Sequence, residues 1–334
     1  MILCIGTTPA TQRVLVFRAL TLDAVNRAVT TLDGVAGKSI NVAKVLKALG
    51  EQPLAMGFLG GDRGERIRTL FKERGIERDF VTVGETTRQC ITIIDQSRGT
   101  QTELVEESRP VAAADYQKLM SRIGRRLKGC RAVVMSGTIT SGVPVDFYLT
   151  CGRMAQEIGA MTVVDAQGAA LIEALKCQPG LVKPNRTELA ATVGRKLRSE
   201  AEVMAAMREL HERGAQRVVV TAGSGPTLAF DGRRAWQILP PRIVAVNPIG
   251  SGDAVTAGLV WRLLGGDDLG EACRWAAAAG AANALTMLAG EVDLGTVQRL
   301  VSEARVKSLT GLKPNNKTKR RRKKNISDYG TFIS

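Results

Sequence analysis

Short apolar runs rich in β-branched residues recur along the chain, and they limit the folds that it can adopt more than any other feature does. Several runs are apolar at consecutive positions, which is typical of strands buried on both faces of a parallel sheet. Most follow one another at intervals of about 20 to 40 residues, which leaves room for crossover helices. The pattern predicts a layered α/β fold. The runs are MILCIG at the start, RAVVMSG near 131, MTVVDA near 161, GLVKPN near 180 and RVVVTAG near 217.

One helix can be outlined in detail after Gly37, in the stretch KSINVAKVLKALG. Apolar residues recur there at the spacing of one helical face, and Gly50 follows as a stop. We expect a helix that packs against the sheet along this stripe and carries its lysines on the other side. The stripe consists of Val42, Val45, Leu46 and Leu49, and the lysines are Lys44 and Lys47.

Two segments, residues 11–34 and 87–108, depart from the βα rhythm. Their partial apolar/polar alternation and the polar turn DQSRGT indicate antiparallel strands with one face in water. We expect these segments to build a small sheet that forms a lid beside the main domain. A lid with an apolar face is covered most simply by a second copy of the chain, so we expect a homodimer through the lid.

The histidine and cysteine content of the chain argues against several kinds of site. The chain has 334 residues and a net charge of +15, with one histidine and six cysteines that form no C-x-x-C pair. This composition argues against imidazole catalysis and structural zinc, and it suits a reducing compartment. No apolar run is long enough to cross a bilayer, and the start resembles no signal peptide. We therefore expect a cytoplasmic protein that does not bind membranes.

Much of the excess charge lies at the C-terminal end. Residues 313–325, KPNNKTKRRRKKN, contain eight Lys or Arg. The segment 313–334 is poor in apolar residues, so we expect a disordered extension to a domain that spans 1–312. A contact with nucleic acid or the ribosome through the 313–324 basic tail is the alternative, and it predicts binding that weakens steeply with salt.

The stretch VNPIGSGDAVTAGLVWRLL, residues 246–264, places two glycines and a serine where an apolar helix begins. Free N–H groups and the helix dipole favour an anion at such a turn, and Gly250, Ser251 and Gly252 let a phosphate approach. Asp253 would repel that phosphate, but it makes sense as a base that takes a proton from an attacking hydroxyl group. The alternative is that Asp253 merely caps the helix. Neither a Walker A motif nor an H-R-D loop is present.

Four motifs in order make a more specific resemblance. The chain resembles the ribokinase-like (PfkB) sugar kinases over about residues 1–300, most closely the branch of 1-phosphofructokinase and tagatose-6-phosphate kinase. This resemblance implies a three-layer α/β/α fold with a mostly parallel central sheet and a small β-sheet lid. It also implies ATP as phosphate donor and Mg²⁺. The motifs are GVAGKSINVAKVLKALG, SGTITSGVP, LVKPNRTEL and NPIGSGDAVTAG.

The resemblance assigns roles to the catalytic and nucleotide side. Asp253 matches the family's catalytic base, and the backbone of Gly250, Ser251 and Gly252 matches its anion hole. Asn185 and Glu188 match an N-x-x-E motif that holds Mg²⁺ through water. On residue type alone they could equally begin a helix as N-cap and N3. The remaining nucleotide contacts that the family implies are Lys183, Thr221, Gly223, Gly225 and, in an Ala-rich helix, Asn283.

For the acceptor sugar, the resemblance implies contacts from Gly37, Lys38, Asn41 and Ser136. Arg27 and Arg88 lie where members that act on phosphosugars hold the phosphate group that the acceptor already carries. A doubly negative substrate needs such cations, because arginine grips phosphate through paired N–H bonds. Without the resemblance, each arginine would be taken for a solvated lid residue.

The chain departs from the family pattern at several positions that bear on specificity. In TPATQ, Thr8 replaces the family's asparagine, and Gln12 replaces an aspartate that binds sugar hydroxyls, so the preferred hydroxyl pattern must change. Ser39 replaces a glycine in the sugar turn, and Pro226 removes an N–H from the nucleotide loop.

The leading hypothesis is an ATP-dependent kinase of a phosphorylated ketohexose such as fructose 1-phosphate, fructose 6-phosphate or tagatose 6-phosphate. The alternative is a sugar-phosphate-binding regulatory protein with weak or lost kinase activity. Release of ADP in the presence of Mg-ATP and a ketohexose phosphate separates the two.

Overall fold

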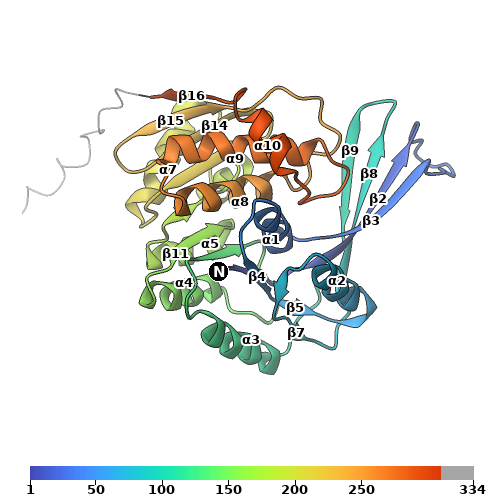
Figure 1. Cartoon of the computed structure of the whole chain (residues 1–334), viewed down its shortest axis with the longest axis horizontal. Coiled ribbons are helices and arrows are strands. Elements are labelled where there is room, and N and C mark those ends of the chain that lie inside the picture. The colour runs from blue at the N-terminus through green and yellow to red at the C-terminus, as the bar shows by residue number, and fades with distance from the viewer. Residues whose placement is uncertain (310–334) are drawn as a thin grey trace, which may run out of the picture.

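The structure is a computed structural model that describes residues 1–309, so the predicted basic extension, residues 313–334, lies outside it. A ten-stranded sheet forms its centre, in the order β16-β15-β14-β13-β12-β11-β10-β1-β4-β6 (Figure 1). The pairs from β6 to β13 are parallel, and β14, β15 and β16 extend the sheet with antiparallel pairs. The strands are β1 (Ile2–Ile5), β4 (Pro53–Met56), β6 (Glu77–Arg78), β10 (Ala132–Ser136), β11 (Met161–Asp165), β12 (Leu181–Val182), β13 (Val218–Ala222), β14 (Gly225–Phe230), β15 (Ala235–Leu239) and β16 (Arg305–Ser308).

Every predicted apolar run contains a strand of this sheet, and the strands are buried on both faces. In β1, for example, Cys4 packs into the core on one side of the sheet and Leu3 into the core on the other. The run at 180 gives only the short strand β12, because Pro184 follows and has no N–H to donate to a ladder.

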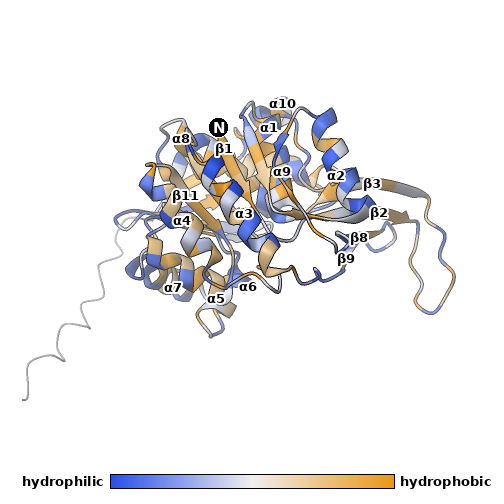
Figure 2. Ribbon diagram, turned by 90° about the horizontal axis from the view of Figure 1, so that it is seen from below, coloured by the Kyte–Doolittle hydropathy of each residue, from blue (hydrophilic) through white to orange (hydrophobic). Residues whose placement is uncertain are grey.

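Helices cover both faces of the sheet, which confirms the predicted three-layer architecture (Figures 1 and 2). The largest contact between two helices joins α8 to α9. One layer consists of α1 (Lys38–Ala48), α2 (Gly61–Glu73), α8 (Ser251–Leu264), α9 (Leu269–Ala284) and α10 (Leu294–Leu300). The other consists of α3 (Ala113–Arg126), α4 (Phe147–Glu157), α5 (Gly168–Ala174) with the 3-10 turn Leu175–Cys177, α6 (Arg186–Thr192) and α7 (Glu200–Glu212).

Helix α1 begins after Gly37 and reaches its cap at Leu49, as predicted, and the predicted apolar stripe is buried. Placing Lys44 on the side away from the core was wrong, because this side chain is buried. Its Nζ donates to the carbonyl oxygens of Val35 and Ala289, at 3.1 and 2.6 Å, and lies 2.9 Å from a carboxylate oxygen of Glu291. These oxygens replace the water that the ammonium group loses.

The segments predicted to form a lid build a separate four-stranded sheet, in the order β3-β2-β8-β9, which projects from the main body in Figure 1. The two hairpins are antiparallel, but they join through a parallel β2–β8 pair that the alternation had not indicated. The strands are β2 (Ala10–Phe17), β3 (Thr30–Ala36), β8 (Arg88–Asp95) and β9 (Thr100–Val105), and a smaller sheet pairs β5 (Phe58–Leu59) with β7 (Val81–Thr82).

The two faces of the four-stranded sheet differ in burial. Val14, Val16 and Ile94 point inward and pack with Leu288. No helix among residues 1–309 is both long and apolar enough to cross a membrane.

Candidate active site

The polar residues gather at the carboxyl edge of the parallel sheet. The chain order reverses at β1, which lies between β10 and β4. Ligands of open α/β sheets bind at such a switch point. Thr8 follows β1, Ser136 ends β10, Asp165 ends β11 and Lys183 follows β12.

The turn before α8 holds the predicted anion hole. Gly250 has a φ of 85°, which only glycine adopts easily. A Cβ there would lie 2.8 Å from Ala289 Cβ and 2.9 Å from the N atom of Gly290. The N–H of Gly252 donates to no atom of residues 1–309. This N–H group, together with the helix dipole, can therefore receive an oxyanion.

Asp253 lies in the first turn of α8 with only 7% of its surface exposed. Asn41 Nδ2 donates to its Oδ2 at 2.7 Å. Burial raises the pKa of Asp253 to about 7, and the charge of Asp165 adds to this effect, although Lys38 and Lys183 oppose it. A carboxylate with a pKa near 7 is suited to take up a proton at neutral pH.

Two lysines and two carboxylates form a network beside Asp253. Lys38 Nζ lies 3.0 Å from Asp165 Oδ1 and 2.9 Å from Glu188 Oε1. Lys183 Nζ lies 3.2 Å from Asp165 Oδ2, which also accepts a hydrogen bond from Thr256 Oγ1 at 2.7 Å. Burial alone would raise the pKa of Asp165, but Lys183 and Lys38 hold it below the usual range. Asp165 is therefore ionised.

Asn185 and Glu188 form a reciprocal capping box at the start of α6, so the capping role considered for them is present. Glu188 Oε2 accepts from the backbone N–H of Asn185 at 2.8 Å, while its Oε1 faces Lys38. One carboxylate oxygen thus serves the helix and the other faces the site.

The donor set suits a hard cation that keeps most of its water. Asp165 Oδ1 and Glu188 Oε1 converge on the ammonium group of Lys38, and carboxylate oxygens are the ligands that Mg²⁺ prefers. Within residues 1–309 no cluster of three or more His, Cys, Asp or Glu could enclose a metal ion. Asp165 and Glu188 are thus the two carboxylates that could hold such a cation through its water.

The predicted nucleotide residues divide into two groups. Thr221 forms a parallel bridge with Asn185, which brings the Gly223–Gly225 turn beside α6. Asn283 is fully buried, and its Nδ2 donates to the carbonyl of Ile249 at 2.9 Å and to Ser251 Oγ at 3.2 Å. In this structure Asn283 braces the turn before α8, and its contact with adenine stays a prediction.

On the acceptor side, Gly37, Lys38 and Asn41 lie together at the start of α1. Asn41 Oδ1 and Ser136 Oγ are buried and have no hydrogen-bond partner within residues 1–309. Buried polar atoms without a partner are uncommon, so these two are positioned to bind hydroxyl groups of a ligand. Ser39 is buried, and its Oγ lies 2.3 Å from where a Cβ on Gly6 would lie. It therefore occupies space above the end of β1.

The remaining predicted acceptor residues are dispersed. Gln12 is buried, its Nε2 donates to Thr92 Oγ1 at 3.3 Å, and its Oε1 accepts from the N–H of Ala289 at 3.1 Å. Arg88 donates to the carbonyl of Thr8 at the edge of the site, with Nη2 at 3.1 Å. Arg27 is exposed in the loop between β2 and β3, at the end of the hairpin opposite Ala10, and none of the site contacts described above involves it.

A family model described as pfkB family carbohydrate kinase matches residues 1–293. The chain belongs to the pfkB family of carbohydrate kinases. It is accordingly an ATP-dependent carbohydrate kinase, as the resemblance of its motifs predicted.

Solved structures of three bacterial proteins are similar to this carbohydrate kinase over most of its length. A putative phosphofructokinase from Staphylococcus aureus is 28% identical with a TM-score of 0.76, and the match covers 92% of this chain and 99% of the other. Phosphofructokinase-2 from Escherichia coli, in complex with fructose-6-phosphate, is 26% identical with a TM-score of 0.82, and the match covers 90% of this chain and 98% of the other. A possible 1-phosphofructokinase from Thermotoga maritima shares the fold. It is 24% identical with a TM-score of 0.85, and the match covers 92% of this chain and 99% of the other.

Sequence reasoning missed three parts of the kinase's site. Asp165 ends the apolar run MTVVD, and its place at the carboxyl end of a strand was the available signal. Thr256 lies one turn after Asp253 on α8. The segment from Leu288 to Glu291, which packs against Gly250 and Lys44, carries no motif and is recognised only in three dimensions.

Proposed function

We propose that this carbohydrate kinase transfers the γ-phosphoryl group of ATP to a hydroxyl group of a phosphorylated ketohexose, giving a bisphosphate. Fructose 1-phosphate, fructose 6-phosphate and tagatose 6-phosphate are the candidate acceptors. One observation carries the proposal: the carboxylate of Asp253, with a pKa near 7, lies in the first turn of α8 beside a free N–H group. A base next to an anion hole is the combination that phosphoryl transfer to an alcohol needs.

In the proposed reaction the acceptor hydroxyl gives its proton to Asp253 as its oxygen attacks the γ-phosphorus, and ADP leaves. Asn41 donates to Asp253 Oδ2 and so orients the carboxylate towards the acceptor. The N–H of Gly252 and the helix dipole stabilise the negative charge on the transferring group. Lys38, at the mouth of the site, adds positive charge and pairs with Asp165 and Glu188.

Mg²⁺ bound with ATP would supply positive charge that neutralises the phosphate groups. Asp165, Asn185 and Glu188 are the residues that would hold its water ligands, since their oxygens face the network around Lys38 or lie beside it. Lys183 and the turn at Thr221 would lie along the phosphates of the nucleotide.

We further propose that the kinase is a homodimer whose copies pair through the outer face of the four-stranded lid sheet. Leu15, Ile91 and Ile93 share that face and are only partly buried, and Leu104 beside them is 50% exposed. Arg27 lies in the loop at the tip of the β2–β3 hairpin, whose strand β2 extends roughly 20 Å from Ala10 at about 3.3 Å per residue. It could therefore hold an acceptor phosphate only in the site of the second copy. The six cysteines are buried and unpaired, which supports a cytoplasmic location.

The test is a panel of the three ketohexose phosphates with Mg-ATP, assayed for ADP with the wild type and Asp253→Asn. We expect turnover of at least one acceptor, and a loss of at least about 100-fold in kcat for the variant, because removing a general base costs about 10²- to 10⁴-fold. Asp293→Asn, which alters the N-cap aspartate of α10, is the matched control and should keep full kcat.

Two outcomes would count against the proposal. Near-normal turnover by Asp253→Asn would remove Asp253 from the role of base. Tight binding of a ketohexose phosphate by the wild type without release of ADP would favour the regulatory binding protein instead.

A further inference from the structure

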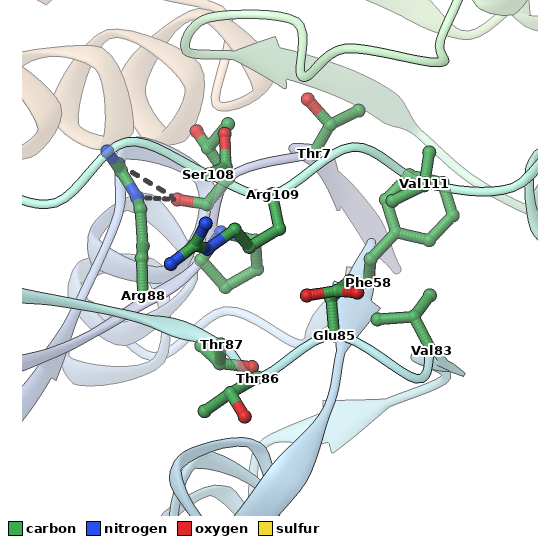
Figure 3. A pocket seen from close by; sticks show the side chains of 12 residues that line it. Thr7, Phe58, Val83, Glu85, Thr86, Thr87, Arg88, Ser108, Arg109 and Val111 are labelled. Carbon is green, nitrogen blue, oxygen red and sulfur yellow. Dashed lines mark hydrogen bonds between the residues drawn. The ribbon is translucent and has the colours of Figure 1, made fainter.

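A cavity adjoins the site at the end of β1 (Figure 3). Thr8 connects the two: it lines this cavity, and its Oγ1 would lie 3.5 Å from a Cβ placed on Gly137, which would itself lie 3.7 Å from Lys38 Cβ. An acceptor that reaches towards Asp253 past Lys38 can therefore extend into this cavity.

Arg88 lines the cavity but is already partly engaged. Its Nε and Nη2 donate to the carbonyl of Thr8 at 3.3 and 3.1 Å, and its Nη1 donates to the carbonyl of Glu106 at 3.2 Å. A guanidinium group has five N–H bonds, so about two remain for a ligand. A phosphate group presents three acceptor oxygens, more than Arg88 can satisfy alone.

Arg109 lines the same cavity, and its guanidinium group has no hydrogen-bond or ion-pair partner within residues 1–309. Its backbone, in contrast, is fixed to the loop after β10. Thr140 Oγ1 donates to the carbonyl of Arg109 at 3.0 Å, and the N–H of Val111 donates to the carbonyl of Ser141 at 2.9 Å. The backbone of Arg109 is thus held in place, and its exposed side chain has no partner that an anion would have to displace.

The rest of the wall favours an anion over a neutral ligand. Thr86 and Ser108 add hydroxyl groups that can donate to phosphate oxygens. Glu85 is the one carboxylate on the wall, so two guanidinium groups outweigh it and the cavity keeps a positive charge. A neutral sugar gains little from such a wall, whereas a phosphate dianion gains charge-assisted hydrogen bonds.

We propose that Arg109 is a specificity-determining residue, which binds, together with Arg88, the phosphate group that the acceptor already carries. The inference rests on the proposed function, since it names the residue by which that site selects a phosphorylated over an unphosphorylated acceptor. The phosphate lies in the cavity of Figure 3, and the sugar ring extends from it past Thr8 towards Asp253.

The experiment compares Arg109→Ala, Arg109→Lys and Glu85→Gln in steady-state assays with fructose 1-phosphate, fructose 6-phosphate, tagatose 6-phosphate and unphosphorylated fructose. We expect Arg109→Ala to raise KM for the preferred phosphorylated acceptor about tenfold or more with little change in kcat, as loss of a charged hydrogen bond does. The KM for ATP and for fructose should stay within about twofold. Arg109→Lys should recover part of the loss, and Glu85→Gln should lower KM.

Arg153→Ala is the control, because Arg153 is an exposed arginine of α4 outside the cavity. The inference would be overturned if Arg109→Ala changed the KM for the phosphorylated acceptor by less than twofold relative to the wild type. A rise in this KM with Glu85→Gln would also overturn it. Calorimetric titration of the wild type and Arg109→Ala with fructose 6-phosphate distinguishes failure of this inference from failure of the proposed function. Binding that weakens in Arg109→Ala supports the inference even where no acceptor is turned over, and equal binding by both proteins overturns it.

Discussion

Two buried aspartates of one site have pKa values shifted in opposite directions, and their direct contacts explain the difference. Asp165 touches Lys38 and Lys183, so the pKa of its carboxyl group is low in spite of burial. Asp253 touches only the neutral amide of Asn41, so burial dominates and its pKa rises. One carboxylate is kept charged for a cation and the other is free to exchange a proton.

The raised pKa of Asp253 predicts the pH profile of the kinase. The base acts only when deprotonated, so log kcat/KM should rise with unit slope up to about pH 7 and then level off. In Asn41→Ala the hydrogen bond that lowers the pKa of Asp253 is lost, so the bend should move to higher pH. The phosphate of the acceptor also titrates near pH 6, but its titration is the same in both enzymes. A bend at the same pH in both would show that another group controls the profile.

At the residue scale, the sequence allowed prediction of those site residues that lie in motifs. Asp253 follows glycines at a helix start, and Asn185 and Glu188 have the spacing of a capping box, so local chemistry identifies all three. Asp165 was not predicted because its partners Lys38 and Lys183 come from other segments, and no local pattern pairs them. Gln12 was expected to face the acceptor, yet both ends of its amide are bonded within the protein.

At the scale of elements, the start of α8 depends on a segment far along the chain. Ala289 and Gly290 pack on Gly250, Lys44 of α1 donates to the carbonyl of Ala289, and Asn283 of α9 accepts from the N–H of Gly290 at 2.7 Å. Helices α1 and α9 thus help to fix the turn that presents the N–H of Gly252. The apolar stripe of α1 was predictable from its period, but the burial of Lys44 was not, since its acceptors are carbonyl groups outside the helix.

This packing predicts unequal effects of two glycine substitutions on α8. Gly250 and Gly266 both have positive φ, at 85° and 94°, but a Cβ meets Ala289 at 2.8 Å only at Gly250 and meets nothing within 4 Å at Gly266. Each alanine should cost about 1–2 kcal/mol in unfolding free energy from backbone strain. Gly250→Ala should also lower kcat at least about tenfold by displacing the free N–H of Gly252, whereas Gly266→Ala should keep it. Equal kcat values for Gly250→Ala and Gly266→Ala, in samples that urea unfolding shows to be folded, would contradict this account.

At the scale of the whole molecule, the order of the sheet explains where the site lies and why the lid is placed beside it. The chain order reverses at β1, between β10 and β4. Both hairpins of the lid start from this edge of the sheet: β2–β3 follows β1 along the chain, and β8–β9 precedes α3. Alternating strands and βα spacing made these layers predictable. The parallel β2–β8 pair was not, because pairing between distant hairpins leaves no periodic signal in either one.

The proposed dimer gives the last prediction. A second copy that covers the outer lid face would bury Ile93, which lies on the central strand β8 between Leu15 of β2 and Thr102 of β9. A charge there should cost more than the contact gains, so Ile93→Glu should sediment as a monomer where the wild type sediments as a dimer. Val306→Glu places the same charge on the exposed strand β16 at the far end of the large sheet, and this variant should stay dimeric. If Arg27 serves the second copy, the monomer and Arg27→Ala should show the same rise in KM for the phosphorylated acceptor. A wild type that sediments as a monomer at micromolar concentrations, or an Ile93→Glu variant that remains a dimer, would exclude this interface.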